Sequence, residues 1–358
     1  MIGALDMHAQ AQDRSWMWEA QDWCAFAFIN CNFLKIAQAI DSAENNLLRI
    51  THALSKQEQI DILAHEILAN WNIEGIDLSK RALRESLSQL FNVTHKLKIK
   101  ANIQEKHATE ATYFALTEQS NLTLEHILQI HQKMKTDAQN DWGVIRKHPE
   151  SVYAQDVYGN CYSVYDAPPA HLVLNLMQKF VDFWNQSLTR LPRSFGSILA
   201  HVFFVTIHPF RDGNGRVARL LADKYLAVRT KQILRPYSIS DILKRNQSAY
   251  YMALESITEK NGLSHFLDFM LAVYTDAVNE AQSRITILLK IYAFLRLKQI
   301  QLKAHDKELL QILISEPKTM WSFFSATKDM EDGEAAECAW HKLCAIVLLD
   351  HGRLVIPD

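Results

Sequence analysis

The segment that most constrains this chain is HPFRDGNGRVAR, which runs from His208 to Arg219. It holds a histidine, a carboxylate and two arginines, and Asn214 lies directly between two glycines. The whole chain of 358 residues contains only 10 glycines. The pair Gly213 and Gly215 therefore indicates a backbone that takes unusual dihedral angles or comes very close to a ligand.

The residues on both sides of this segment predict helices. Leu199–Ile207 is apolar enough for a buried helix, and residues 217–228 favour a second one. We therefore expect a loop that opens onto a helix N-terminus, where free N–H groups and the helix dipole favour an anion. Arg216 and Arg219 are three residues apart and can project to the same side. A triphosphate suits such a site. The alternative is a plain polar turn between two core helices in which the charged residues are clustered by chance.

The same residues suit phosphoryl chemistry. A hydroxyl that attacks phosphorus needs a positioned base, and neutral His208 suits that task near pH 7. Negative charge develops on the phosphate oxygens, so a metal ion, N–H donors and arginines are expected to converge there. Asp212 alone is sufficient as a protein ligand of Mg²⁺, because phosphates and water complete the shell of that ion.

The segment also matches the signature of the Fic family, H-x-F-x-[DE]-G-N-G-R-x-x-R, at every specified position. The resemblance implies an all-α core that transfers AMP from ATP to a hydroxyl side chain of a target protein. It implies that His208 is the general base, that Asp212 holds Mg²⁺ and that Phe210 buries its ring to hold the loop. It further implies phosphate contacts from an anion hole (Gly213, Asn214 and Gly215), from Arg216 to the bridging phosphates and from Arg219 to the γ-phosphate.

A second stretch, NWNIEG at residues 70–75, follows a region of helical periodicity, and its final Gly75 suits a helix C-cap. It resembles the inhibitory helix of many Fic proteins, [ST]-x-x-x-E-[GN], whose glutamate pairs with the second arginine of the signature. We expect an ion pair of Glu74 with Arg219 that blocks the γ-phosphate site, because a carboxylate can pair with a guanidinium in bidentate fashion and so compete with a phosphate. Asn70 departs from the pattern, and it either replaces the lost hydroxyl hydrogen bond or leaves the inhibition looser. The alternative is a surface glutamate near a helix end.

Residues 151–157 alternate β-branched and aromatic residues with others ahead of Gly159 and Asn160, which predicts a β-hairpin. The hairpin falls where Fic cores carry a flap that holds the target by strand-like pairing, so we expect target binding by Val152, Tyr153, Ala154 and Gln155. A two-stranded excursion without function is the alternative. Farther along, Tyr250 and Tyr251 resemble the family stretch that lines the nucleoside, and these rings either stack on adenine or pack in the core.

Four sections are expected along the chain: a loose tail (1–14), an N-terminal helical domain with the inhibitory stretch (15–92), a Fic catalytic domain (93–278) and a C-terminal helical, winged-helix-like domain (279–358). The second section opens with Trp16, Trp18 and Trp23 and resembles a domain of unknown function often found in front of Fic cores. Further helices are expected over 78–91, with Ser79 as N-cap, over 122–134 and over 172–183.

The last section is expected to hold helices over 304–313 and 335–349 and a short strand near the C-terminus. Its acidic run at residues 329–334 argues against a nucleic-acid surface, so packing or dimerisation is favoured, with a homodimer as one candidate. The spacing of Cys338, His341 and Cys344 is compatible with a metal site, although one helical face explains it as well.

Composition favours a protein of the cytoplasm. The formal net charge of −2 gives no general attraction to nucleic acid or to an acidic membrane. No apolar run reaches the roughly 20 residues that span a bilayer, and the N-terminus lacks a signal pattern. The five scattered cysteines indicate reduced thiols.

The sequence thus predicts an all-α, Fic-type protein adenylyltransferase with an intramolecular brake. It would use ATP and Mg²⁺ to modify a Ser, Thr or Tyr of a target protein or of itself, and release pyrophosphate. Three alternatives stay open: transfer of another group such as UMP or phosphocholine, removal of AMP with Glu74 orienting a water, and a catalytically silent regulatory or toxin–antitoxin-like binding module. Asp212 and Arg219 favour a nucleoside triphosphate with a metal, and neither the base nor an arginine is missing, as a silent module would suggest.

Overall fold

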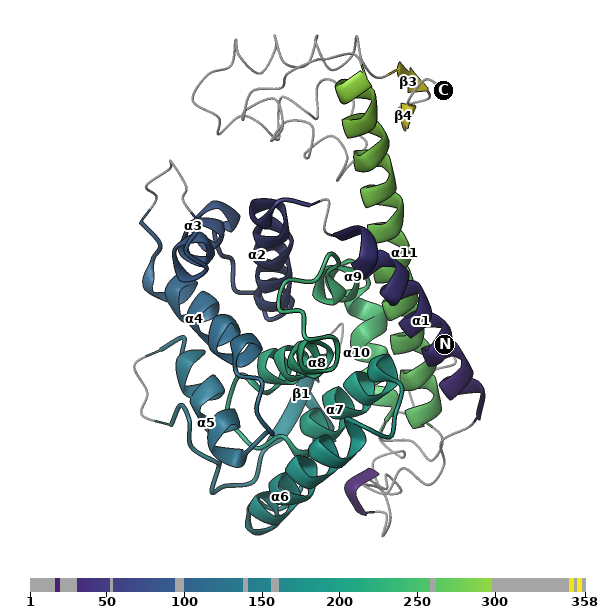
Figure 1. Ribbon diagram of the computed structural model, residues 1–358. Helices are drawn as coiled ribbons and strands as arrows, with labels where there is room; N and C mark the ends of the chain where they lie inside the picture. Colours follow the sequence, from purple (N-terminus) through teal and green to yellow (C-terminus); the bar gives the residue numbers. More distant parts are fainter. Residues whose placement is uncertain are drawn as a thin grey trace, which may run out of the picture. The chain divides into compact units, whose positions relative to one another are not determined.

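The computed structural model of the chain describes residues 17–19, 31–51, 54–93, 100–137, 141–155, 161–257, 262–297, 348–350 and 353–355. Most of these residues are helical, which confirms the expected all-α class (Figure 1). The chain divides into two compact units, residues 1–278 and residues 279–358. Within the described ranges, no helix is both long and apolar enough to cross a lipid bilayer.

The first unit consists of helices with one inserted hairpin. Its elements in chain order are η2 (Met17–Glu19), α1 (Cys31–Ile50), α2 (Lys56–Ile73), α3 (Lys80–Leu90), α4 (Ile103–Thr117), α5 (Leu124–Lys133), β1 (Ser151–Gln155), β2 (Cys161–Asp166), α6 (Ala170–Ser187), α7 (Arg193–Ile207), α8 (Asn214–Thr230), α9 (Ile239–Arg245), α10 (Gln247–Ser256) and the first part of α11 (Gly262–Leu297).

Local signals in the sequence set several helix starts. Ser55 and Glu58 form a capping box at α2, in which the serine hydroxyl accepts from the Glu58 N–H at 3.2 Å and the carboxylate accepts from the Ser55 N–H at 2.6 Å. Asn102 and Glu105 form the same arrangement at α4. Ser79 caps α3, as predicted. These bonds satisfy N–H groups that have no partner inside their own helix.

The core of the first unit lies around α7 and α8. Nearly all of α7 is buried, and α8 packs against it. The helices α2 to α5 lie to one side of this pair in Figure 1. Five fully buried rings fill the space among α6, α7 and α8, namely Phe180, Trp184, Phe203, Phe204 and Tyr225. This aromatic packing holds the start of α8, and therefore the motif, on a rigid base.

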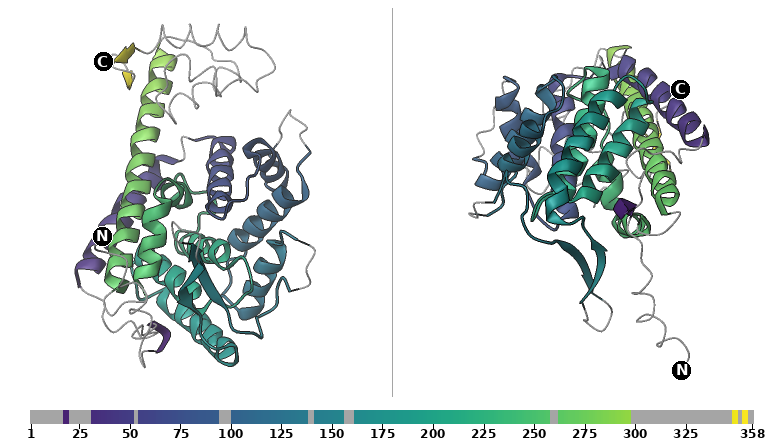
Figure 2. Two further views of the ribbon diagram at one scale, coloured as in Figure 1. Left: turned by 180° about the vertical axis from the view of Figure 1, so that it is seen from behind. Right: turned by 90° about the horizontal axis from the view of Figure 1, so that it is seen from below.

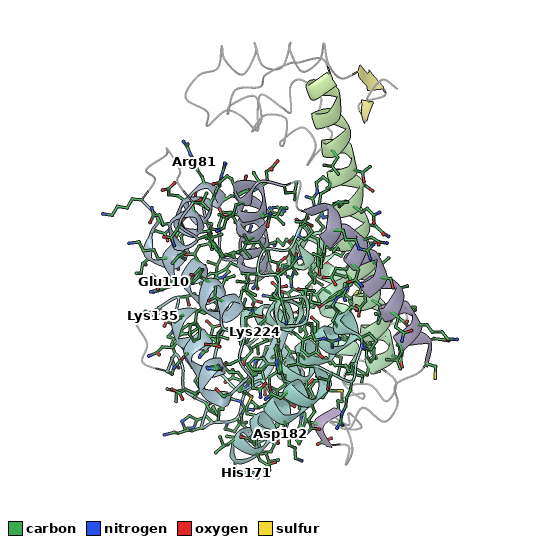
Figure 3. All side chains as sticks on the ribbon, viewed as in Figure 1. Arg81, Glu110, Lys135, His171, Asp182 and Lys224 are labelled. Carbon is green, nitrogen blue, oxygen red and sulfur yellow. The ribbon has the colours of Figure 1, made fainter. Side chains whose placement is uncertain are left out.

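One buried cation ties α8 to α4. Lys224, labelled in Figure 3 among the interior side chains, donates to the carbonyl oxygens of Ala115, at 2.9 Å, and Glu118. Burial lowers the pKa of Lys224 to about 8. Since the last carbonyls of a helix have no partner inside it, these bonds fasten the C-terminal end of α4 to the core.

The hairpin predicted near residues 151–157 is present. β1 and β2 pair antiparallel, and the register shifts opposite Val152 and Tyr153, where β2 has the extra residue Val164. The hairpin extends away from the helices in the right-hand view of Figure 2. The indole N–H of Trp18, in η2, donates to the carbonyl oxygen of Asp166 at 2.9 Å. The N-terminal segment therefore contacts the end of β2. The expected tail, Trp16 and Trp23 lie outside the described residues.

In the second unit the structure describes the later part of α11 and a short hairpin of β3 (Leu348–Asp350) and β4 (Arg353–Val355). The strand expected near the C-terminus corresponds to β4. The helix expected over 335–349 does not reach its predicted end, because Leu348 and Leu349 pair with β4. In the sequence, apolar residues lie on both sides of the dipeptide His-Gly at 351–352, a pattern that favours such a pairing. The remaining predictions for this unit lie outside the described residues.

Candidate active site

The motif forms a tight loop between α7 and α8. His208 ends α7 in the left-handed region, with a φ of 50°, and Gly213 precedes α8 with a φ of 77°. Side chains are strained in that region, which accounts for a glycine at position 213. The Asn214 side chain closes the loop by accepting from the Phe210 N–H at 2.9 Å and donating to the Phe210 carbonyl at 2.8 Å. An anion at this helix start would therefore meet main-chain N–H groups.

His208 is held in the form that can accept a proton. Its Nδ1 lies 3.3 Å from the carbonyl oxygen of Val205. A carbonyl only accepts, so Nδ1 carries the proton and Nε2 keeps its lone pair. Burial lowers the pKa of His208 to about 4, and the positive charge of Arg146 adds to that effect. Near pH 7 the ring is therefore neutral with a free Nε2, as a general base requires.

Asp212 lies at the entrance to this loop with 51 % of its side chain exposed. One oxygen accepts from the Gly213 N–H at 2.6 Å, and the other accepts from Arg216 at 3.1 Å. A carboxylate has further lone pairs, so this half-exposed group fits a ligand of Mg²⁺. The described residues contain no group of three or more His, Cys, Asp or Glu side chains that could hold a metal ion. An ion beside Asp212 would therefore depend on substrate oxygens and water.

Arg216 lies between two indole rings. Its guanidinium carbon is 4.9 Å from the ring centroid of Trp71, in α2, and 5.6 Å from that of Trp142. The residue is only 1 % exposed, and Nε and Nη1 lack a hydrogen-bond partner within the part of the chain that the structure describes. Indole faces stabilise a cation that has lost its water. Sequence reasoning missed both tryptophans.

Arg219 and Glu74 form the predicted ion pair. Glu74 directly follows α2, and its Oε1 accepts from Nη2 of Arg219 at 2.5 Å. One carboxylate oxygen makes this contact, and other donors of Arg219 contact Asn70. The Arg219 Nε donates to the Asn70 side-chain oxygen at 2.7 Å, and Nη2 also donates to the Asn70 carbonyl at 3.0 Å. Asn70 therefore makes a direct hydrogen bond to Arg219, and whether this bond replaces the one lost with the hydroxyl stays a prediction.

The Glu74 carboxylate occupies the space beside the first turn of α8. A Cβ atom on Gly215 would lie 2.6 Å from Oε1 of Glu74 and 3.2 Å from Nη1 of Arg219. Both distances are shorter than ordinary van der Waals contacts. The close approach predicted at Gly215 is thus made here by a carboxylate of the chain itself, at a helix start that favours anions.

The end of α2 is fastened to α9 and α10. The Asn72 carbonyl accepts from Lys244 at 2.7 Å, and the Ile73 carbonyl accepts from Gln247 at 2.8 Å and from the Tyr251 hydroxyl at 2.9 Å. These are carbonyls of the last turn, which have no partner inside the helix. They determine where α2 ends and hence where Glu74 lies.

The two tyrosines predicted near the nucleoside differ in their surroundings. Tyr250 is fully buried, and its hydroxyl lies 2.9 Å from Nε2 of His201 and 3.5 Å from Nη1 of Arg219. In this structure Tyr250 packs in the core, the second of the two alternatives for this ring. Tyr251 is 44 % exposed, so its contact with adenine stays a prediction.

The hairpin lies beside the proposed base. The ring of Tyr165, in β2, has its centroid 6.4 Å from that of His208, and its hydroxyl donates to the Thr206 carbonyl. Val152 and Tyr153 are exposed on β1, whereas nothing is described for the side chains of Ala154 and Gln155. Target binding by these four residues stays a prediction.

His131, in α5, is a site residue that sequence reasoning missed. Its ring stacks on Phe210 with centroids 3.6 Å apart. Nδ1 accepts from the Gly143 N–H at 2.8 Å, so the proton is on Nε2, which donates to the Asp212 carbonyl at 3.0 Å. Burial lowers its pKa to about 4. No local pattern marks this residue, because two of its partners, Phe210 and Asp212, lie in a loop far along the chain.

Two known families match parts of this chain. Residues 121–226, which contain the loop and most of α8, match the Fic/DOC family. Residues 16–93 match a domain of unknown function, DUF4172. The chain thus carries a Fic/DOC domain that follows a DUF4172 domain. This agrees with the family resemblance of the twelve-residue motif.

Individual relatives agree with this assignment. A probable protein adenylyltransferase of Aquifex aeolicus is 33 % identical over 95 residues, which span 26 % of this chain and only 27 % of that relative. A Fic family protein from Desulfovibrio desulfuricans has the same fold, with a TM-score of 0.55 at 20 % identity over 84 % of this chain and 85 % of the other. A Fic-domain signaling protein from Bacteroides thetaiotaomicron gives a TM-score of 0.50 at 18 % identity, over 69 % and 95 % of the two chains.

Proposed function

We propose that this chain is a Fic-type protein adenylyltransferase inhibited by its own α2. It transfers AMP from ATP to a Ser, Thr or Tyr hydroxyl of a target protein or of itself. The observation that carries this proposal is the carboxylate of Glu74, which lies 2.5 Å from Arg219 and against Gly215, at a helix start suited to phosphate. The adenylyltransferase name of the Aquifex relative supports the same reaction.

In the proposed reaction His208 acts as general base. The target hydroxyl oxygen forms a bond to the α-phosphorus of ATP, and its proton passes to Nε2. The bond between that phosphorus and the oxygen bridging to the β-phosphate breaks, so pyrophosphate leaves with the bonding electrons. The pKa of about 4 keeps Nε2 unprotonated at neutral pH, which makes it available at every encounter with a target.

The remaining residues of the motif are assigned to binding the negatively charged phosphates. Main-chain N–H groups at the start of α8 bind phosphate oxygens, with Arg216 on the bridging phosphates and Arg219 on the γ-phosphate. Asp212 holds Mg²⁺, which neutralises phosphate charge when it is bound. Arg216 donates to Asp212 through Nη2, while its Nε and Nη1, which lack a partner among the described residues, remain to meet a phosphate oxygen.

Inhibition follows from competition for Arg219. A Glu74 carboxylate and a γ-phosphate are both anions, and the same guanidinium cannot face both without their mutual repulsion. Glu74 directly follows a helix whose last carbonyls are anchored by Lys244, Gln247 and Tyr251, so its main chain is held beside Arg219. Release therefore needs a new rotamer of the Glu74 side chain, a movement of the last turn of α2 or a reorientation of Arg219.

The test is an intact-mass measurement on the full chain after incubation with Mg²⁺ and each of the four nucleoside triphosphates in turn. Glu74→Gly is expected to gain the mass of AMP with ATP, and the Glu74→Gly/His208→Ala double variant to gain none. A UMP, CMP or GMP adduct in place of AMP would show that the donor is the corresponding nucleoside triphosphate and not ATP. The same variants are also incubated with a cell lysate and labelled nucleotide. No adduct on the chain and no labelled protein in the lysate would together refute the proposed transfer.

A further inference from the structure

Arg146 lies between α5 and β1 and has an unusual set of partners. It is only 7 % exposed, and its guanidinium donates to three main-chain carbonyls. Nε donates to His208 at 2.7 Å, Nη1 to His148 at 2.9 Å and Nη2 to Pro168 at 2.6 Å. A planar guanidinium directs its donors in fixed directions, so these three carbonyls are held in one arrangement.

The three carbonyls belong to the two ends of the hairpin and to the catalytic loop. His148 precedes β1 and Pro168 follows β2, while His208 is the proposed base. The main chain adds to this arrangement, because the Arg146 N–H donates to the Pro209 carbonyl at 2.9 Å. One residue therefore contacts both ends of the flap and the loop of the base.

The charge of Arg146 also acts on His208. After burial itself, this guanidinium is the main positive influence that lowers the His208 pKa, whereas the carboxylates of Glu74 and Asp212 raise it. The Tyr165 hydroxyl near the ring is neutral, since burial raises its pKa well above 10. Arg146 thus has a geometric and an electrostatic effect, and substitutions can separate the two.

We propose that Arg146 is a positioning residue that holds the ends of the β1–β2 flap at a fixed place relative to His208. The proposal rests on the proposed function in that the flap presents the target hydroxyl to Nε2 of His208. A flap that shifts by about 1 Å would misplace that hydroxyl, which costs on the order of 100-fold in rate. The phosphate contacts proposed above involve residues 213–219 and not the His208 and Pro209 carbonyls that Arg146 contacts, so ATP binding is expected not to depend on this contact.

The experiment compares Arg146→Lys and Arg146→Gln in the full chain carrying Glu74→Gly. Lysine keeps the charge but lacks the planar set of donors, and glutamine lacks both. Arg211→Gln is the matched control. It also removes a guanidinium from the loop between α7 and α8, but this one is exposed and pairs with the side chains of Asp137 and Asp141. Four quantities are measured: amide hydrogen exchange of β1 and β2, the His208 pKa by NMR titration, the affinity for Mg·ATP by calorimetry, and the rate of AMP transfer onto the chain itself.

Both Arg146 variants are expected to exchange flap amides at least about tenfold faster, since hydrogen bonds to a charged group are lost. The His208 pKa is expected to rise in Arg146→Gln and to stay low in Arg146→Lys. Affinity for Mg·ATP should stay within about twofold, while AMP transfer onto the chain itself falls at least about tenfold. Arg211→Gln should change none of these.

Two results would overturn the proposal. One is wild-type flap exchange in both Arg146 variants while they remain folded. The other is a parallel loss of Mg·ATP affinity, which would indicate general damage to the fold and not a positioning role. Hydrogen exchange and the NMR titration need no nucleotide. If they respond as expected but Glu74→Gly transfers no AMP, the proposed function fails and the Arg146 contact stands.

Discussion

Asn70→Ala is the substitution that tests most sharply how α2 holds Arg219. The Asn70 side-chain oxygen accepts from Nε of Arg219 at 2.7 Å, and both residues are at least 95 % buried. Alanine removes this acceptor and leaves the N–H without a partner, while the bond to the Asn70 carbonyl remains. A hydrogen bond to a charged group contributes about 1.5–3 kcal/mol. The inhibited state should therefore lose that much free energy relative to a state with α2 withdrawn. The equilibrium between the two states should then shift by roughly 10- to 100-fold.

The assay is the initial rate of AMP transfer from radiolabelled ATP onto the chain itself. Asn70→Ala should transfer faster than wild type, up to the rate of Glu74→Gly. Asn72→Ala is the matched control, because it removes the same amide from the same helix turn at a position whose contact to Lys244 is made by the main chain. If Asn70→Ala and Asn72→Ala transfer at the same rate, Asn70 does not hold Arg219 in the inhibited state.

Three further substitutions test separate contacts. Trp71→Leu removes one aromatic face from the buried cation of Arg216, whereas Trp71→Phe keeps one. The thermal midpoint of unfolding should therefore fall further in Trp71→Leu, and equal midpoints in the two variants would exclude this role of Trp71. Burial raises the pKa of Glu66, in α2, to about 7, above its ordinary 4.5, so its contribution to stability is present below pH 4.5 and is lost as the pH rises through 7. The difference in unfolding free energy between wild type and Glu66→Gln, measured by denaturation from pH 4 to 8, should change by up to about 1.4 kcal/mol per pH unit, and a constant difference would contradict this. Asp212→Ala in the Glu74→Gly background should remove the Mg²⁺ dependence of ATP binding measured by calorimetry, and an unchanged dependence would exclude the metal role.

Local sequence signals predicted much of the fold. The apolar run before the motif became the buried α7, and Ser79 begins α3 as its side chain predicts. The alternation near residues 151–157 identified the hairpin. These features depend on near neighbours in the chain, so composition and spacing are sufficient to indicate them. The end of the helix expected over 335–349 was wrong, because pairing with β4 is decided by a partner strand.

The candidate site was predictable only where a motif carried it. The pair of Glu74 and Arg219 was expected from two motifs, whereas the hydrogen bond from Arg219 to the Asn70 side chain was not specified by either. His131 and Arg146 had no such signal. Each donates to main-chain carbonyls of the loop after α7. Every residue has such a carbonyl, so the sequence does not indicate which ones accept these bonds. Contacts of this kind become visible only when the helices are packed.

The central claim is that the Glu74 carboxylate occupies the place of an ATP phosphate at Arg219. Its most direct test is a calorimetric titration of Mg·ATP into wild type, Glu74→Gly and the Glu74→Gly/Arg219→Ala double variant. The account predicts tighter binding by Glu74→Gly than by wild type, and loss of that gain in the double variant. Equal affinity in wild type and Glu74→Gly, or an undiminished gain without Arg219, would contradict it.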